Sequence, residues 1–223
     1  MKFEAILFDL DGTLLDTLDD LTDAVNYALR QEGFPCRGRD EVRMFVGNGI
    51  SRLLSLSVPA GTEEARTARA LACFRTYYAD HAALKTHPYP GIPELLQTLT
   101  AQGMKIAVVS NKFDAAVKAL SRQYFPCIPE ELCIGEAMPM RRKKPAPDSL
   151  FDALALLGVP KENAVYAGDS EVDIETAKNA QIPCISCTWG FRGEAALLKA
   201  GAEIIISSPA ELPAALDALA KEI

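Results

Sequence analysis

Six short apolar runs separated by amphipathic segments limit most strongly what this chain can fold into. Most runs are continuously apolar rather than alternating, as expected of strands that helices cover on both faces. Strand, helix and strand in succession predict an α/β fold with a doubly wound parallel sheet. The strands are expected at 4–10, 105–111, 131–135, 164–169, 183–189 and 203–208, with helices between them at 93–102, 115–123, 149–157 and 174–179.

The segment 16–85 interrupts this alternation and contains no convincing strand. Leucine and valine recur there at helical spacing, and further helical patterns follow around 41–45, 50–56 and 63–78. A crossover between parallel strands needs only about a dozen residues, so this segment predicts an inserted α-helical domain. We therefore expect a Rossmann-like core from residues 1–15 and 86–223 and a helical domain from residues 16–85.

The charge balance limits the partners of the chain. Its 223 residues include 23 Lys and Arg against 30 Asp and Glu, a formal net charge of −7. This balance argues against broad nucleic-acid binding, which needs a basic face. No apolar stretch approaches the ~18 residues of a membrane span, and no secretory signal pattern opens the sequence. We expect a cytoplasmic protein that acts on a small molecule.

Reactive side chains follow four of the predicted strands. In an open parallel sheet, ligands bind outside the carboxyl ends of the strands, so these side chains are expected to share one site. They are Asp9 and Asp11 after the first strand, Ser110 and Asn111 after the second, Lys144 after the third, and Asp169 and Asp173 after the fourth.

Such a group of side chains suits phosphoryl transfer. Crowded carboxylates repel one another unless a cation joins them, and oxygen ligands suit Mg²⁺. The hydroxyls of Thr13 and Ser110 can hold phosphoryl oxygens beside Lys144. Asp9 can attack phosphorus to form an aspartyl-phosphate, and Asp11 can donate a proton to the leaving oxygen and then activate water.

Each motif also has an ordinary structural explanation. Asp11-Gly12 is a common turn signal, and Thr13 or Asp169 can cap a helix. The segment 110–111 is also a plausible loop start, and the basic run 141–144 resembles a solvated surface. These explanations become weaker when all the motifs occur together in one predicted site.

The four motifs resemble those of the haloacid dehalogenase superfamily of phosphatases, in order and over essentially the whole chain. D-x-D-G-T-L occupies residues 9–14, the second motif is residues 110–112, the third is the lysine of Lys144-Pro145, and G-D-S-x-x-D occupies residues 168–173. The resemblance implies Mg²⁺ as cofactor. It also implies that the inserted helical domain is the small cap found between the first two motifs.

The resemblance also implies a role for each motif residue. Asp9 would be the nucleophile and Asp11 the general acid and base. The Asp9 side chain, the Asp11 backbone carbonyl and Asp169 would be magnesium ligands. The remaining roles would be outer-shell orientation by Asp173 and phosphate binding by Thr13, Ser110, Asn111 and Lys144, with Lys143 replacing Lys144 in a shifted alignment.

Asp11 favours phosphoryl transfer over dehalogenation, because haloacid dehalogenases proper lack an equivalent aspartate. The details resemble phosphoglycolate phosphatases most, in residues 46–49 and 188–192 and in the closing segments 200–203 and 208–212. Backbone amides of Gly47, Asn48 and Gly49 could bind a substrate carboxylate, with Arg43 and Arg52 as further candidates.

The expected substrate is a small phosphorylated metabolite, 2-phosphoglycolate first, and the protein is expected to be a monomer or homodimer. Sugar phosphatases, pyrophosphatases and β-phosphoglucomutases have the same core fold and cap, and they remain alternatives. A catalytically silent binding or regulatory protein is the alternative outside enzymes, and the complete set of motif residues argues against it.

Overall fold

The structure is a computed structural model that describes residues 3–137 and 141–222. The chain forms two compact units, one made of residues 1–15 and 88–223 and the other of residues 16–87. Each unit has its own secondary structure and its own core, and the two are described separately below.

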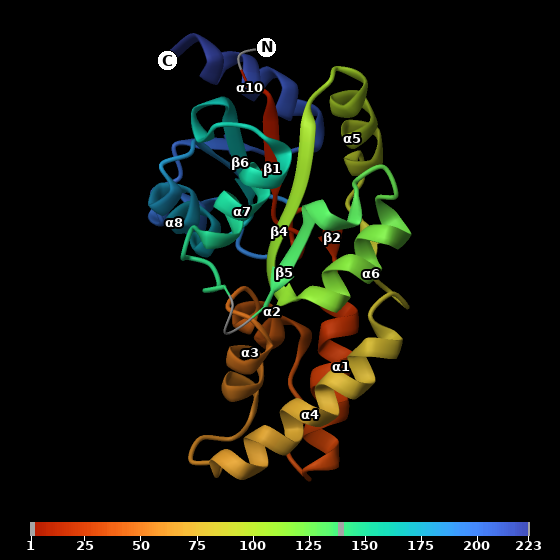
Figure 1. Cartoon of the computed structure of the whole chain (residues 1–223). Helices are drawn as coiled ribbons and strands as arrows, with labels where there is room; N and C mark the ends of the chain where they lie inside the picture. The colour runs from red at the N-terminus through yellow and green to blue at the C-terminus, as the bar shows by residue number, and fades with distance from the viewer. Residues whose placement is uncertain (1–2, 138–140, 223) are drawn as a thin grey trace. The chain divides into compact units, whose positions relative to one another are not determined.

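A six-stranded sheet forms the centre of the first unit, in the order β5-β4-β1-β6-β7-β8 (Figure 1). Every adjacent pair is parallel. Numbered by their own succession, these strands have the order 3-2-1-4-5-6 of a doubly wound fold, with the switch point between β1 and β6. The strands are β1 Ala5–Phe8, β4 Lys105–Phe113, β5 Cys133–Glu136, β6 Ala164–Gly168, β7 Cys184–Cys187 and β8 Ile204–Ile206. The predicted fold class and all six expected strands are confirmed.

Helices cover the sheet, with α7 and α8 on one side and α5 and α6 on the other (Figure 1). The helix α7 packs on β4 and β1, and α8 packs on β6 and β7. The helices of this unit are α5 Ile92–Ala101, α6 Asp114–Tyr124, α7 Asp148–Leu157, α8 Glu171–Ala180, α9 Glu194–Lys199 and α10 Leu212–Glu222, with short 3₁₀ turns at Glu130–Leu132, Lys161–Asn163 and Pro209–Glu211.

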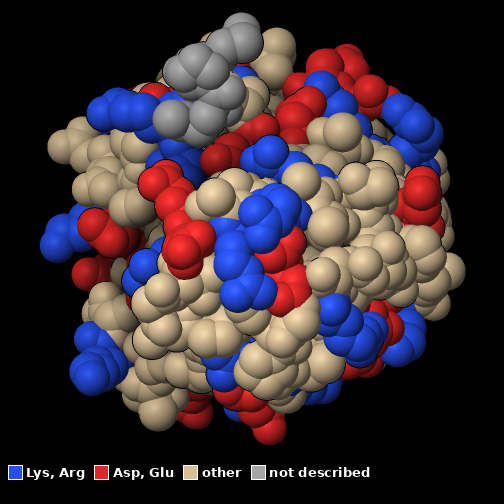
Figure 2. Space-filling view, turned by 90° about the horizontal axis from the view of Figure 1, so that it is seen from below, with Lys and Arg blue, Asp and Glu red and all other residues tan. Residues whose placement is uncertain are grey.

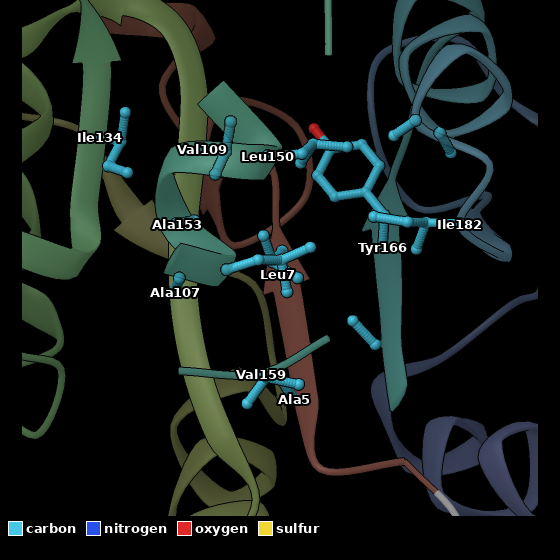
Figure 3. Packing of buried hydrophobic residues seen from close by; sticks show 14 residues of the cluster. Ala5, Leu7, Ala107, Val109, Ile134, Leu150, Ala153, Val159, Tyr166 and Ile182 are labelled. Carbon is cyan, nitrogen blue, oxygen red and sulfur yellow. The ribbon is translucent and has the colours of Figure 1, made fainter. Parts of the chain in front are cut away.

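The core beneath α7 explains why these strands are apolar. All four residues of β1 are buried, and Leu7 pairs in register with Ala107 on one side and Tyr166 on the other. Leu150 of α7 is fully buried in the same cluster (Figure 3). Burying a side chain such as Leu7 contributes about 1.5–3 kcal/mol. This packing fixes the height of the strand ends, where the polar side chains lie.

The second unit consists of four helices: α1 Leu18–Gln31, α2 Arg39–Phe45, α3 Ile50–Ser57 and α4 Glu64–His81. The predicted helical insert is therefore confirmed. Its main packing is between α1 and α4. Val25 of α1 and Tyr78 of α4 are fully buried, and the rings of Phe74 and Tyr78 stack with centroids 5.3 Å apart.

A two-stranded ribbon was not expected from the sequence. The strands β2 Leu15–Asp16 and β3 His87–Pro88 pair with each other, and the boundary between the two units falls within them. Two-residue strands are too short to show an alternating pattern, so pattern analysis cannot find them.

Positive and negative side chains intermingle on the face shown in Figure 2. This face therefore carries both signs of charge rather than a uniformly basic surface. Across the two described stretches of chain, none of the helices combines the length and the apolar character that a membrane crossing requires.

Candidate active site

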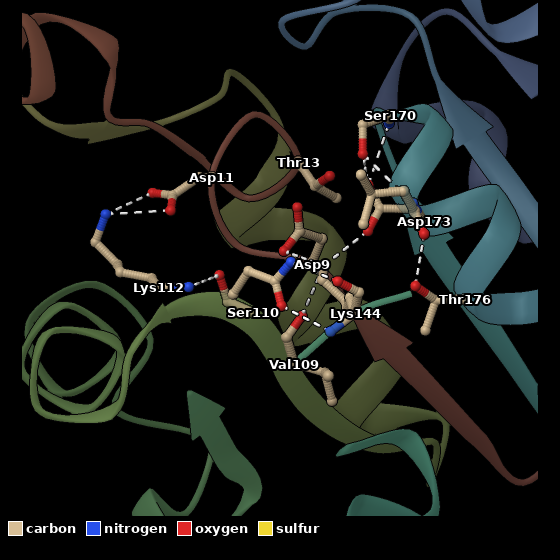
Figure 4. Close-up of polar contacts among 12 residues, drawn as sticks. Asp9, Asp11, Thr13, Val109, Ser110, Lys112, Lys144, Ser170, Asp173 and Thr176 are labelled. Atoms are coloured by element: carbon tan, nitrogen blue, oxygen red, sulfur yellow. Dashed lines mark hydrogen bonds and ion pairs between the residues drawn. The ribbon is translucent and has the colours of Figure 1, made fainter. Parts of the chain in front are cut away.

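Polar side chains gather at the carboxyl ends of β1, β4 and β6, around the switch point of the sheet. Asp9 follows β1 and Asp169 follows β6, and these two strands are neighbours. Figure 4 shows Asp9 in the middle, Asp11 and Lys112 on one side, and Lys144 and Asp173 on the other. The structure thus brings together side chains from four separated parts of the sequence.

Lys144 is a buried cation at the centre of this group. Its Nζ donates to Asp9 Oδ1 at 2.8 Å, to Asp173 Oδ1 at 2.7 Å and to the Tyr166 hydroxyl at 2.8 Å. The residue is 2% exposed, whereas Lys143 is exposed. Of the two lysines considered from the sequence, Lys144 contacts the carboxylates of Asp9 and Asp173.

The backbone of Lys144 is fixed by Asn111. The Asn111 side chain donates from Nδ2 to the Lys144 carbonyl at 3.0 Å, and its Oδ1 accepts from the Lys144 amide at 2.8 Å. Since Asn111 belongs to β4, this reciprocal pair holds the lysine at a fixed height above the sheet. The side chain of Asn111 therefore acts on the lysine backbone here.

Asp173 receives hydrogen bonds on both oxygens. Ser170 Oγ donates to Oδ2 at 2.6 Å, and the Tyr166 hydroxyl donates to Oδ1 at 2.8 Å. Burial alone would raise the pKa of Asp173, but the ammonium of Lys144 and these hydrogen bonds outweigh burial, and the pKa lies below its usual value. Asp173 is therefore ionised and also forms the capping box that begins α8.

Asp9 and Asp169 have the opposite electrostatic balance. Burial, followed by repulsion from Asp173, raises the pKa of Asp9 to about 7 despite its contact with Lys144. Burial and repulsion from Asp173 and Asp9 also raise the pKa of Asp169 well above its usual value. Asp9 and Asp173 share the ammonium of Lys144. Asp173 also accepts hydrogen bonds from Ser170 and Tyr166, which stabilise its ionised form further.

Two glycines allow the backbone to pass close to Asp169. Gly12 has φ +90°, and a Cβ there would lie 2.4 Å from Asp169 Oδ2. A Cβ on Gly190 would lie 2.3 Å from the Gly12 carbonyl and 2.4 Å from the same carboxylate oxygen. The close approach lets the Phe191 amide donate to Asp169 Oδ2 at 2.6 Å. Thr13 also reaches this carboxylate, with its Oγ1 3.4 Å from Oδ1.

Three buried carboxylates could hold a metal ion. Oxygens of Asp9, Asp169 and Asp173 lie within 4.8 Å of one another. Oxygen donors are those that hard divalent cations prefer, and a cation here would relieve the repulsion that raises the pKa values of Asp9 and Asp169. The donor set therefore fits a metal. It includes Asp173, for which the sequence predicted an outer-shell place.

Asp11 contacts a lysine to which sequence reasoning gave no role. Lys112 Nζ lies 2.8 Å and 3.1 Å from the two carboxylate oxygens of Asp11. The amide of Lys112 also donates to Ser110 Oγ at 3.2 Å. The period of two residues in a strand could have indicated that Ser110 and Lys112 share a face. The roles of Tyr166 and Ser170 were also missed.

The candidate substrate residues from the insert lie within the second unit. Gly47, Asn48 and Gly49 form the turn between α2 and α3, with φ +118° at Gly47 and +79° at Gly49. Arg43 pairs with Asp40 at 3.5 Å, and Arg52 is exposed. The positive φ angles explain why glycine occupies both ends of this turn.

Comparison with known proteins identifies the family of this chain. The model of the haloacid dehalogenase-like hydrolases matches residues 6–187, which include every strand-end side chain described above. The chain belongs to the haloacid dehalogenase-like hydrolase family. The family resemblance predicted from the sequence is therefore confirmed.

Curated relatives within this family carry one recurring name. A protein of Pseudomonas syringae pv. tomato named phosphoglycolate phosphatase is 35% identical over 196 residues, which cover 83% of this chain and 70% of the relative. A Thiobacillus denitrificans protein of the same name is 29% identical over 220 residues, with 95% and 94% of the two chains covered.

Solved structures of the family have the same fold. A crystal structure of a candidate phosphoglycolate phosphatase from Lactobacillus delbrueckii subsp. bulgaricus is 38% identical with a TM-score of 0.88, and 95% of this chain and 97% of that chain are covered. The CbbY protein of Rhodobacter sphaeroides, solved in complex with phosphate, is 30% identical with a TM-score of 0.74 and coverage of 96% and 99%.

Proposed function

We propose that this chain is a Mg²⁺-dependent phosphatase that hydrolyses a small phosphomonoester through an aspartyl-phosphate on Asp9. One observation carries the proposal: the buried Asp9 carboxylate lies at the switch point of the sheet. Its Oδ1 accepts a hydrogen bond from Lys144, and its neighbours include the carboxylates of Asp169 and Asp173. A carboxylate held by one oxygen in a water-poor site is suited to attack phosphorus with the other oxygen.

In the first half of the reaction, Asp9 Oδ2 attacks phosphorus while the bond from phosphorus to the ester oxygen breaks. Asp11 donates a proton to that leaving oxygen. Lys144 and the Ser110 hydroxyl hold phosphoryl oxygens and orient the group for in-line attack. Asn111 holds the backbone of Lys144 and in this way keeps the ammonium in place.

In the second half, Asp11 accepts a proton from water while the water oxygen attacks phosphorus. The bond between phosphorus and Asp9 breaks, and inorganic phosphate is released with Asp9 regenerated. The sum of the two halves is ester plus water to alcohol plus phosphate, so no further reactant is required.

The Asp9 and Asp169 side chains and the Asp11 backbone carbonyl would hold Mg²⁺, which when bound supplies positive charge beside the phosphate. Asp173 would orient this shell from its own network with Ser170, Tyr166 and Lys144. The raised pKa values of Asp9 and Asp169 support the need for a cation at this position.

We propose 2-phosphoglycolate as the first substrate to test. Support comes from the name shared by relatives at about 35% identity and from the likeness to the Lactobacillus structure. The insert would act as a cap that excludes water and selects substrates, with residues 47–49 and Arg43 as candidates for recognising a carboxylate. Sugar phosphates, pyrophosphate and nucleotides belong in the same substrate panel.

Hydrolysis of p-nitrophenyl phosphate tests the mechanism. We expect release of phosphate that requires Mg²⁺, stops with chelator and is lost in Asp9→Asn. Persistence of activity in the chelator, or in the asparagine variant, would exclude the mechanism. Ranking by kcat/KM then tests the substrate, and a rank for 2-phosphoglycolate below the other phosphate esters would refute that part alone.

A further inference from the structure

The ion pair between Lys112 and Asp11 is a specific feature of the site. The ammonium contacts both oxygens of Asp11, at 2.8 Å and 3.1 Å, and the side chains are only 2% and 13% exposed. Lysine is rarely buried to this degree without a partner, because taking the ammonium out of water costs free energy. Asp11 supplies the charge that offsets this cost, so the two side chains depend on each other.

The end of β4 is shaped to place this lysine. The pairing of β4 with β5 changes register between Val109 and Phe113, an irregularity that brackets Ser110 and Lys112. Irregularities of this kind bend a strand and redirect its side chains, and they occur often beside active sites. Lys112 is also tied to the neighbouring phosphate-site residue, because its amide donates to Ser110 Oγ.

Contact with both oxygens restricts the rotation of the Asp11 carboxylate. In Figure 4 this carboxylate points toward Lys112, on the side of Asp9 opposite Lys144. In an in-line displacement the ester oxygen departs from the side of phosphorus opposite the attacking Asp9 oxygen, so the group that protonates it must be a residue other than Asp9. An acid must be held within hydrogen-bond reach of the atom that it protonates, and small displacements are costly.

We propose that Lys112 is a positioning residue that holds Asp11 where it protonates the leaving oxygen, and that Lys112 thereby allows the enzyme to use esters with poor leaving groups. This inference rests on the proposed function and adds a residue to it. In its acid form Asp11 gives a proton to the ester oxygen as the phosphorus–oxygen bond breaks and the bond between Asp9 Oδ2 and phosphorus forms. Asp11 is then left as the carboxylate that pairs with Lys112 in this structure.

The leaving group provides a readout that a purely structural role would not change. A p-nitrophenolate departs without a proton, whereas an alkoxide needs one. We therefore compare kcat/KM for ethyl phosphate and p-nitrophenyl phosphate in the same sample of each variant. Because both rates scale with the folded fraction, their ratio is independent of how much of a variant folds.

Lys112→Met keeps most of the apolar stem and removes the ammonium. We expect its alkyl-to-aryl ratio to fall by at least about tenfold, since general acid catalysis contributes roughly 10²–10⁴-fold. Lys112→Arg, which keeps a cation, should retain a larger share of the ratio. In an Asp11→Asn background, Lys112→Met should change the ratio no further, because the group that it positions is already lost.

Lys118→Met is the matched control. Lys118 belongs to the same unit and pairs with Asp114 within α6 at 2.6 Å. Its loss removes one ammonium and one ion pair but should leave the alkyl-to-aryl ratio unchanged.

Three results would overturn the inference. The first is an equal decrease of kcat/KM for both esters in Lys112→Met. The second is an increase of kcat/KM for ethyl phosphate in this variant, which would mean that the lysine holds Asp11 away from the reaction. The third is a rise in KM for 2-phosphoglycolate with no change for ethyl phosphate, which would mean that Lys112 binds a substrate carboxylate. A wild-type enzyme without Mg²⁺-dependent hydrolysis would instead reject the proposed function.

Discussion

The two units of this protein each bury an aspartate, and the two are treated very differently. Asp20, in the helical insert, is 2% exposed and accepts backbone hydrogen bonds from Lys85 at 2.9 Å and from Thr86 at 2.8 Å. Asp9, in the sheet unit, is 7% exposed and faces two other carboxylates and a lysine. Burial alone therefore does not distinguish a structural acid from a reactive one.

The partners of each carboxylate make the difference. Fixed amide donors satisfy Asp20 and tie the start of α1 to the chain that returns from the insert. Around Asp9 the partners are themselves charged, and burial with repulsion raises the pKa of Asp9 to about 7. The charges around Asp9 therefore cost stability that the amide contacts of Asp20 do not, as is common where buried charges serve function rather than folding.

The largest expected effect comes from exchanging the two aspartates for asparagine in turn. Asp9→Asn should lower phosphate release by at least roughly 10³-fold, because it removes the proposed nucleophile. Asp20→Asn should keep kcat within about tenfold, because Asp20 touches no reacting atom, and should lose about 1–2 kcal/mol of stability. Phosphate release and urea unfolding measure both effects, and a collapse of turnover in both variants would remove the distinction.

A lysine in each unit extends the comparison. Lys144→Met should lower kcat/KM roughly 10²–10³-fold, and should destabilise the fold by about 3–5 kcal/mol because it leaves buried carboxylates unbalanced. Lys85→Met removes an exposed pair with Asp23 at 2.6 Å, and it should change the unfolding free energy far less than Lys144→Met does, because water screens exposed ion pairs. Equal losses of unfolding free energy in the two variants would contradict the special state of Lys144.

The pH dependence of stability should also reveal the Asp9 site. The folded-state pKa of Asp9 is about 7, above its usual value of 3.8, so the folded protein binds the proton more tightly. In chelator, this group should therefore lower stability as pH rises from about 4 to about 7. Asp9→Asn should flatten this fall and raise the unfolding free energy at pH 8 by about 1–2 kcal/mol.

Thermal unfolding of both proteins between pH 4 and 8 measures this effect. Addition of Mg²⁺ at pH 8 should raise the midpoint of the wild type more than that of the variant, because binding to the folded state stabilises it. Parallel pH curves for the two proteins in chelator would contradict the electrostatic account of Asp9.

The smallest effect is expected from Tyr166→Phe. This change removes the hydroxyl that accepts from Lys144 and donates to Asp173, each at 2.8 Å, and leaves the ring in the core. We expect a loss of about 1 kcal/mol of stability and a decrease in kcat of about fivefold. An unchanged kcat would show that the remaining contacts of Lys144 orient it without the hydroxyl of Tyr166.

The sequence predicted those parts of the molecule that depend on local pattern. The apolar runs around Ile6, Val108 and Val165 identified strands, and strand ends then placed Asp9 beside Asp169. Contacts set by side-chain direction could not be predicted. Lys112 was visible in its motif, but its pairing with Asp11 depends on the irregular end of β4. Tyr166 lies within an apolar run, and nothing in that pattern indicates that its hydroxyl reaches Lys144.

The amide pair between Asn111 and Lys144 has a consequence for how the protein can be varied. The height of the lysine above the sheet is set by a neighbouring strand, through two hydrogen bonds at 3.0 Å and 2.8 Å. Because Asn111 lies on β4, a change that moves the end of this strand also moves the ammonium of Lys144. Substitutions in the strand can therefore alter the charge offered to Asp9 and Asp173 without touching the lysine itself.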